Sequence, residues 1–165
     1  MNQPGESVTF RQIGETDVES AALACVEIAR FMKGNESDLY IDSLPTDITP
    51  ELIGWCERFV GDPIRSGWIA ERGGEALGLL LGEIVPSNLP AAVTSMVGYI
   101  SVLWVKETER RQGIGRGLTE RAEEWFRSHH VFVCEVSWLA KNEMADGAWQ
   151  KMGYSLFRVS GFKNF

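Results

Sequence analysis

One segment restricts the possible folds of this chain more than any other: residues 100–126, with the sequence ISVLWVKETERRQGIGRGLTERAEEWF. Its first residues are β-branched and apolar, as in a strand from the middle of a sheet. Its last part places apolar residues at helical spacing, namely Ile114, Leu118, Ala122, Trp125 and Phe126. Between the two patterns lie arginines and glycines. The segment therefore predicts a strand, a tight turn and an amphipathic helix in direct succession.

The turn is suited to an anion, because it combines Arg110, Arg111 and Arg116 with Gly113 and Gly115. The N–H groups of a helix's first turn have no partner within the helix, and the helix dipole adds partial positive charge there. Glycine allows a phosphate or pyrophosphate to approach these N–H groups closely. The alternative is a helix start that only needs tight turning, with the arginines as ordinary surface charges.

Two common phosphate-binding motifs are excluded. The P-loop requires GxxxxGK followed by Ser or Thr, and no stretch of the chain matches it. The dinucleotide fingerprint GxGxxG requires a third glycine where this chain has Leu118, and it expects the turn early in a parallel βαβ unit. If the glycine turn binds an anion, it does so through neither of these two motifs.

Hydrophobic periodicity predicts the remaining elements. Strands are expected at residues 8–13, 68–72, 76–85, 99–105, 131–136 and 154–159, and helices at residues 18–34, 49–60, 114–127 and 145–152. Glycines 73 and 74 join two of the strands into a hairpin, which excludes a purely parallel sheet. The order β-α-α-β-β-β-α-β-α-β indicates an α/β domain with a mixed sheet.

Length and composition indicate one globular domain over residues 1–165, since 44% of the residues are hydrophobic. We expect no membrane span and no secretory signal. Cys25, Cys56 and Cys134 show no CxxC spacing, which favours reduced thiols and a cytoplasmic location, and two adjacent histidines make a metal site improbable. A net charge of −7 argues against a nucleic-acid partner.

Two motifs make the chain similar to the GNAT superfamily of N-acetyltransferases. LWVKETERRQGIGRGL (residues 103–118) resembles motif A of that family, in which a strand ending L-x-V precedes Gln or Arg, then x-x-Gly-x-Gly at a helix start. NEMADGAWQKMGY (residues 142–154) resembles its later motif, and residues 10–17 resemble its usual opening. One departure is Glu107, where the family often has proline.

The resemblance implies a mixed sheet with a V-shaped split that admits the pantetheine arm of acetyl-CoA, flanked by helices. It implies acetyl-CoA as cosubstrate and no metal. The expected cofactor-binding residues are Leu103, Trp104, Val105, Arg110, Arg111, Gln112, Gly113, Ile114, Gly115, Arg116, Asn142 and Trp149. Leu103 and Val105 should act through their backbone groups, since their side chains suit the core.

The reaction that the resemblance implies is direct attack of a primary amine on the thioester. An ammonium group must first lose a proton, and Glu83 and Glu135 are the candidate bases, because a carboxylate within an apolar strand must face a cleft or a partner. Either could instead be a rim carboxylate facing water. Many relatives use a tyrosine as the acid where this chain has Trp149. Here either water assists the departing thiolate or another residue acts; Tyr99, Ser137 and Tyr154 are the candidates, and Tyr154 also suits a packing role after Gly153.

The acceptor is expected to be the amine of a small molecule or a peptide, and an acidic stretch at residues 36–51 slightly favours a cation. A longer acyl donor is a further possibility. Because Trp149 replaces the tyrosine, the alternative function is a catalytically silent CoA-binding sensor or interaction module. A homodimer is possible, since dimers are frequent in the family, but nothing in the residues demonstrates one.

Overall fold

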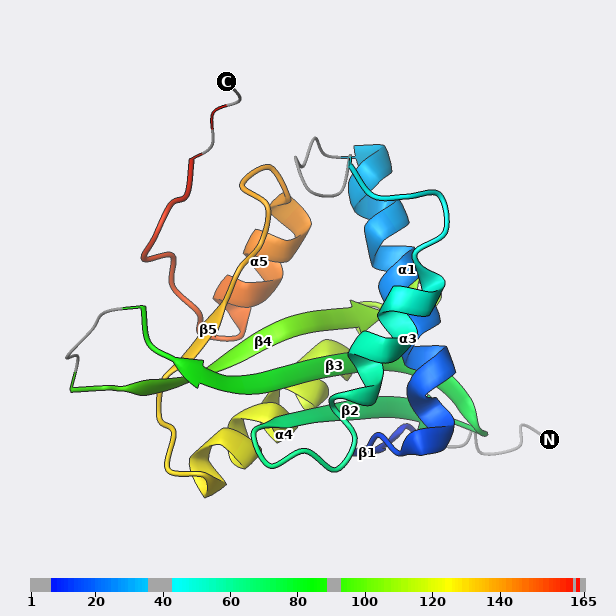
Figure 1. The fold of residues 1–165 in the computed structure, drawn as a ribbon, viewed down its shortest axis with the longest axis horizontal. Helices are drawn as coiled ribbons and strands as arrows, with labels where there is room; N and C mark the ends of the chain where they lie inside the picture. Colours follow the sequence, from blue (N-terminus) through cyan, green and yellow to red (C-terminus); the bar gives the residue numbers. More distant parts are fainter. Residues whose placement is uncertain (1–6, 36–42, 89–92, 162, 164–165) are drawn as a thin grey trace.

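The computed structural model describes residues 7–35, 43–88, 93–161 and 163. The elements, in chain order, are β1 (Thr9–Gln12), the 3-10 turn η1 (Glu15–Asp17), α1 (Val18–Asn35), α3 (Thr49–Glu57), β2 (Arg65–Arg72), β3 (Glu75–Pro86), β4 (Met96–Val105), η2 (Glu107–Glu109), α4 (Ile114–Ser128), β5 (Cys134–Val136) and α5 (Glu143–Lys151). The order β1-β2-β3-β4-β5 in the sheet follows the chain (Figure 1). The pairs β1–β2, β2–β3 and β3–β4 are antiparallel, and the pair β4–β5 is parallel, which confirms the predicted mixed sheet.

Helices cover both faces of the sheet, so that each face buries its own apolar cluster (Figure 1). On one face α4 contributes Ile114, Leu118, Ala122 and Phe126 to a cluster with residues of β2, β3 and β4. On the other face α1 and α3 pack against Leu79 and Leu81 of β3. The helical spacing read from the sequence thus corresponds to buried faces. The glycine turn lies between the end of β4 and the start of α4.

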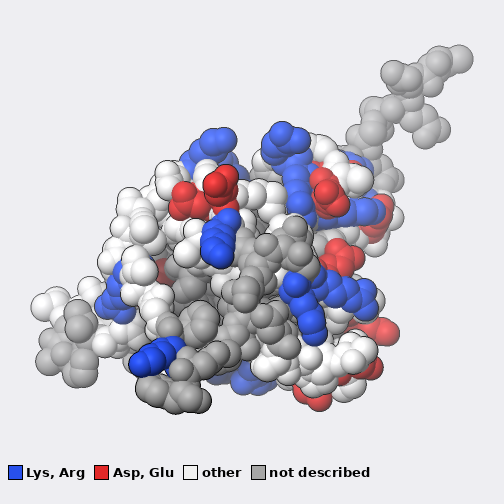
Figure 2. Space-filling view, turned by 90° about the horizontal axis from the view of Figure 1, so that it is seen from above, with Lys and Arg blue, Asp and Glu red and all other residues white. Residues whose placement is uncertain are grey.

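The surface seen in Figure 2 lies at the β4 side of the sheet, at the top of Figure 1. Lys and Arg side chains are spread over this surface, with Asp and Glu between them. The net charge of the chain is −7, so the basic groups on this surface run against the average charge of the molecule. Local charge is therefore no obstacle to an anionic ligand on this side.

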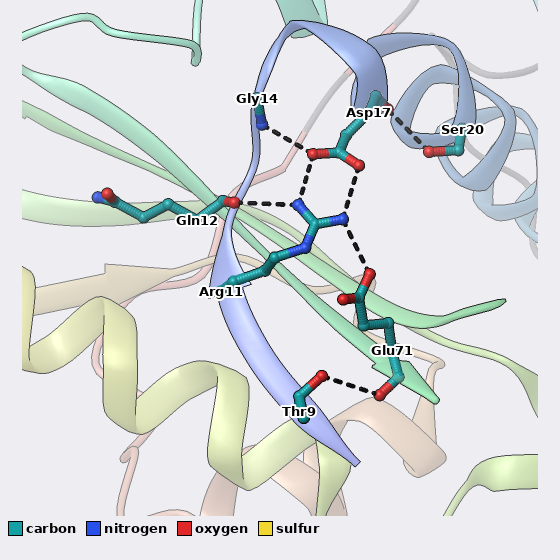
Figure 3. A network of polar contacts seen from close by, with 7 residues as sticks. All are labelled: Thr9, Arg11, Gln12, Gly14, Asp17, Ser20 and Glu71. Atoms are coloured by element: carbon teal, nitrogen blue, oxygen red, sulfur yellow. Dashed lines mark hydrogen bonds and ion pairs between the residues drawn. The ribbon is translucent and has the colours of Figure 1, made fainter. Parts of the chain in front are cut away.

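An ion-pair network joins the first strand to the first helix and to β2 (Figure 3). Two nitrogens of Arg11 donate to Asp17 at 2.7 and 2.9 Å, and one of them also donates to Glu71 at 2.8 Å. The N–H of Gly14 donates to the same Asp17 carboxylate at 2.8 Å. These bonds, led by the one from Arg11, lower the pKa of Asp17 below its usual value of 3.8. The network fixes the entry of the chain into α1.

This network predicts a measurable dependence of stability on pH. A carboxylate with a lowered pKa stabilises the folded state above its unfolded pKa, and that contribution is lost as pH falls through the folded pKa. We expect Asp17→Asn to lower the free energy of unfolding by about 1–2 kcal/mol at pH 7, a figure reduced because Arg11 is partly exposed. Urea unfolding should show the two proteins converging below about pH 4. Glu15→Gln, at an exposed carboxylate nearby, is the control, and a pH-independent difference for Asp17→Asn would contradict the assignment.

Two sequence-based expectations about the C-terminal part were wrong. The strand expected at residues 131–136 is formed only over Cys134–Val136. Residues 154–159, expected to be the last strand, have no regular secondary structure, and Leu156, Phe157 and Val159 are 65%, 63% and 86% exposed. A strand needs a partner for its backbone groups, and residues 154–159 find none in the described part of the chain. Alternation of residue types cannot reveal whether that partner exists.

Candidate cofactor and acceptor site

The sheet opens between β4 and β5. The two strands pair only where Gly98–Ile100 meet Cys134–Val136, whereas β4 continues to Val105. A register shift in β4 between Ile100 and Val102 accompanies the separation. Beyond this point the outer edge of β4 carries no strand in the described structure. This opening corresponds to the V-shaped split that the family resemblance implied.

The backbone direction along β4 can be read from one hydrogen bond. The N–H of Lys106 donates to the Leu77 carbonyl of β3 at 2.9 Å. Because backbone groups of successive residues alternate between the two edges of a strand, Val105 and Leu103 direct theirs to the open edge. The backbone of Trp104 faces β3, and its indole N–H donates to Glu27 on α1 at 3.1 Å. Leu103 and Val105, rather than Trp104, are placed to pair with an added ligand.

The start of α4 leaves a row of backbone donors unpaired. Gly113 is the N-cap, with φ of +87°, and no side chain caps the helix. The first helical bond runs from Gly117 to the Gly113 carbonyl at 2.9 Å. In the described chain, the N–H groups from Arg111 to Arg116 have no hydrogen-bond partner. A helix start of this kind needs water or a ligand to satisfy its donors, and an anion fits best.

The side chains of this turn have separate tasks. Arg110 donates to the Val105 carbonyl at 3.2 Å, and Arg116 donates to the Lys151 carbonyl at the end of α5 at 2.8 Å. Gln112 donates to the Thr108 carbonyl at 3.3 Å, and Ile114 is buried in the core. Arg111 is exposed and holds a left-handed backbone with φ of +62°. Arg110 and Arg116 each donate to a carbonyl, whereas among the described residues the Arg111 guanidinium has no such partner and is free to meet a phosphate.

The later motif forms α5, beside the split. The side-chain oxygen Oδ1 of Asn142 accepts from the Ala145 N–H at 2.9 Å and so caps the helix. Trp149 is only 6% exposed and packs edge-on against Tyr154, with ring centroids 5.1 Å apart. Tyr154 donates to Glu123 at 3.0 Å, and burial raises the pKa of its hydroxyl. Trp149 and Tyr154 therefore have clear packing roles, and contact between Trp149 and a cofactor stays a prediction.

The three candidate catalytic residues lie in one row across the sheet. Glu83 of β3 is paired in register with Tyr99 of β4, and Tyr99 is paired with Glu135 of β5. Residues directly opposite each other share a face. Glu83 also shares the face of Leu79 and Leu81, which is the face covered by α1 and α3. The structure thus brings together two carboxylates and a phenol from three separate strands.

Glu83 is held by two partners that the sequence analysis did not identify. The Ser101 hydroxyl donates to one Glu83 oxygen at 2.9 Å, and Arg65 lies 3.4 Å from the other. Ser101 sits at the register shift of β4, where the open edge begins. The sequence did contain a signal for the first partner, because Ser101 is a serine in a mostly apolar strand. Arg65 could not be found in this way, because its place beside Glu83 follows from the register in which β2 pairs with β3. The carboxylate of Glu83 is therefore oriented where the split starts.

An apolar hollow of about 320 Å³ lies between α1, α3 and β4. Its walls include Ile28, Met32, Leu52, Trp55 and Val102, and Glu51 is the only carboxylate among the described residues that line it. Val102 is the residue of β4 that lines the hollow, and it directly follows Ser101, the partner of Glu83; Glu83 itself does not line the hollow. The hollow can take an apolar group of moderate size next to a carboxylate.

Cys25 also lines this hollow, but its thiol is not poised to react. A hydrogen bond with the Cys56 thiol, together with burial, raises the pKa of Cys25. All three cysteines are free. Within the described residues no group of three or more His, Cys, Asp or Glu could hold a metal ion, and no helix there is long and apolar enough to cross a membrane. A thiolate nucleophile at Cys25 is therefore not supported.

Comparison with solved structures relates this geometry to known folds. The structure resembles that of a GCN5-related N-acetyltransferase from Ralstonia eutropha JMP134, with a TM-score of 0.75 and 21% sequence identity over 96% of this chain and 99% of that chain. The aminoglycoside N-acetyltransferase AAC(6')-Iy in complex with CoA gives 0.76 at 16% identity, over 99% of both chains. For the aminoglycoside 6'-N-acetyltransferase AAC(6')-Ih from Acinetobacter baumannii the TM-score is 0.74 at 19% identity, over 96% of this chain and 99% of that chain. A search of curated proteins finds no match.

These structural likenesses establish the fold. The family is established by a match of the sequence to a family model. The model of the acetyltransferase (GNAT) family matches residues 28–154, which is most of the chain. The match includes β4, the glycine turn, α4 and α5, the elements that build the open edge and the uncapped helix start. This chain belongs to the GNAT family of acetyltransferases.

Proposed function

We propose that the protein transfers an acetyl group from acetyl-CoA to the primary amine of a small molecule or a peptide. The observation that carries the proposal is the row of unpaired N–H groups from Arg111 to Arg116, at the end of the open edge of β4. A pyrophosphate satisfies donors of this kind, and an extended pantetheine arm can pair with the edge like an added strand. The solved relative that binds CoA supports the choice of ligand.

The residues assigned to the cofactor follow from these two features. Backbone groups of Leu103 and Val105 hold the arm, and the backbone from Arg111 to Arg116, including Gln112, Gly113, Ile114 and Gly115, holds the pyrophosphate. The Arg111 guanidinium adds attraction, and Arg110 steadies the turn through its bond to Val105. The amide nitrogen of Asn142 is available, because its oxygen caps α5. We place Trp104 and Trp149 behind this contact surface rather than in it.

Acetyl-CoA supplies an activated acetyl thioester, and the protein manages the protons. Glu83, directly or through one water, takes a proton from the acceptor ammonium, so that the neutral amine can form the C–N bond. A backbone N–H at the open edge of β4 stabilises negative charge on the carbonyl oxygen. The attacking nitrogen then loses its second proton to water, the C–S bond breaks, and Tyr99 or water gives a proton to the sulfur. Glu135, on the other side of Tyr99, is the second candidate base.

The apolar hollow beside Val102 suggests which acceptors fit. Its lining offers much apolar surface and one carboxylate, Glu51, so that an amine with a single positive charge and an apolar body suits it better than a strongly polar polyamine. Two solved relatives act on aminoglycosides, which keeps those antibiotics in any substrate panel. We also propose a cytoplasmic location, which the free thiols and the need for acetyl-CoA support.

The proposal is tested in two stages. Thermal melting with and without saturating acetyl-CoA should show a higher melting temperature with the ligand, because a ligand that binds only the folded state stabilises it. CoA release should then be measured with phenylethylamine, hexylamine, spermidine, an aminoglycoside and a peptide amine. We expect the highest kcat/KM with one of the first two. The absence of a thermal shift would contradict cofactor binding, and so the function.

The second candidate function is a CoA-binding sensor or interaction module without catalysis. Trp149 favours it, because an indole N–H cannot act as an acid near neutral pH where relatives use a tyrosine. The two functions differ in the same assay. A sensor gives the full thermal shift yet releases no CoA above background with any amine of the panel.

A further inference from the structure

A small charged cluster lies where the connection after α3 enters β2. The Asp62 Oδ1 oxygen accepts a hydrogen bond from the Ile64 N–H at 2.9 Å, which fixes the carboxylate at this corner of the chain. The other oxygen, Oδ2, accepts a hydrogen bond from a terminal nitrogen of Arg65 at 3.3 Å. The Ile64 carbonyl accepts from the Ile84 N–H of β3 at 2.8 Å, so that the corner is anchored to the sheet. Arg65 is therefore held by a carboxylate that is itself fixed.

Arg65 begins β2 and is paired in register with Glu83 of β3. Residues that lie directly opposite each other in an antiparallel pair share a face, so that their side chains meet. The Nε of Arg65 lies 3.4 Å from Oε2 of Glu83, and the Ser101 hydroxyl donates to Oε1 at 2.9 Å. The side chains of Arg65 and Glu83 are 27% and 23% exposed. Each oxygen of Glu83 thus has its own partner, and the carboxylate is still accessible to a ligand.

Ser101 reaches Glu83 because of the irregularity in β4. Ile100 and Val102 pair with consecutive residues of β3, so that Ser101 between them is an extra residue of the strand. A bulge of this kind redirects a side chain and increases the local twist. Beyond it, β4 forms the open edge. The orientation of Glu83 is therefore linked to the place where the sheet opens.

Arg65 differs from an ordinary surface ion pair, which contributes about 0–1 kcal/mol to stability. It lies between two carboxylates, those of Asp62 and Glu83. Glu83 in turn stands in one row with Tyr99 and Glu135 across the opening sheet. Because Asp62 takes part of the guanidinium charge, Arg65 can orient Glu83 without occupying its oxygen as fully as a dedicated partner would. This arrangement suits a carboxylate that must keep its direction and still accept a proton.

We propose that Arg65, held in place by Asp62, is the positioning residue of Glu83 in acetyl transfer. This inference rests on the proposed function, in which Glu83 takes a proton from the acceptor ammonium. Arg65 acts through Glu83 and needs no contact of its own with the acceptor or with acetyl-CoA. Displacement of a reacting group by about 1 Å can cost about 100-fold in rate. The contribution of Arg65 should therefore appear in kcat and not in cofactor binding.

The test begins with Arg65→Met, which keeps a long side chain and removes its charge. With the best amine of the panel we expect kcat to fall about tenfold, while the KM for acetyl-CoA is unchanged. Arg65→Lys restores a cation and should recover most of the loss. The loss should be smaller with an acceptor amine that is already neutral at the assay pH, since no ammonium then has to be deprotonated. A merely structural role of Arg65 would not distinguish between these acceptors.

Two further variants serve as a second test and as the control. Asp62→Asn still accepts from the Ile64 N–H but no longer carries a charge for Arg65, and it should lower kcat by about threefold. In Arg127→Met the missing arginine is one that lies 3.7 Å from Glu123 in the last turn of α4. This control should keep the natural kcat. All variants should retain the circular dichroism of the natural protein.

A double-mutant cycle separates positioning from a general effect on the fold. In the Glu83→Gln background Arg65→Met should cause no further loss of kcat, because no base remains to be positioned. Equal losses in both backgrounds would overturn the proposal, as would a natural kcat in Arg65→Met, and either result would leave acetyl transfer standing. If the natural protein releases no CoA with any amine of the panel, then acetyl transfer itself is contradicted and the positioning role with it.

Discussion

Gly113→Val should abolish the stabilisation of the protein by acetyl-CoA. Gly113 has a φ of +87°, which a β-branched residue tolerates poorly, so that the turn must change and its N–H groups lose their common direction. Open space surrounds the position where a Cβ would lie, so the effect comes from the backbone rather than from a clash. We expect affinity to fall about 100-fold, or about 2.7 kcal/mol, as measured by calorimetric titration and thermal melting.

Gly61→Val is the matched control for this substitution. Gly61 also has a positive φ, +69°, and open space at its Cβ, but it lies in the connection between α3 and β2. Both variants carry similar backbone strain, and only the first alters the start of α4. Equal losses of acetyl-CoA affinity in the two variants would mean that strain, and not the anion site, explains the result.

Glu83→Gln should lower kcat roughly 100-fold or more while acetyl-CoA binding is unchanged. The amide keeps the size of the side chain and can still pair with Ser101, but it cannot take a proton from the acceptor ammonium. Single-turnover assays with the best amine of the panel measure the chemical step. The loss should diminish at high pH, where more of the amine is already neutral.

Glu135→Gln is the comparison that decides between the two candidate bases. Glu135 shares the same face of the sheet and borders Tyr99 from the opposite side. If Glu135→Gln shows the large loss of kcat and Glu83→Gln does not, then the assignment of the base is reversed. If neither variant is affected, proton removal does not depend on this row of residues.

Local patterns predicted most of the fold, because most elements bury a periodic face. The helix that begins at Ile114 could be predicted because Ile114, Leu118 and Phe126 all point into one cluster. The last strand could not, since pairing of residues 154–159 depends on a partner and not on their own composition. The short β5 has the same explanation, because its length is set by where β4 diverges from it.

The candidate site was predictable where it consists of backbone and less so where it consists of side chains. The turn from Arg110 to Gly115 could be read directly, since glycine spacing determines how N–H groups are presented. The partners of Glu83 required the sheet register, which no local pattern contains. Arg116 also illustrates the difficulty: its charge suggested a phosphate contact, but its guanidinium caps the last turn of α5.

The uncapped start of α4 has a consequence for the lifetime of the protein in a cell. Without a ligand, only water satisfies the N–H donors at this helix start, so the ligand-free protein is less stable than the complex. A ligand at 100 times its Kd would raise the free energy of unfolding by about 2.7 kcal/mol. Proteases that act on transiently opened chains should therefore remove the empty form faster. Metabolic scarcity of acetyl-CoA would then reduce the abundance of the protein itself, in addition to its rate of turnover.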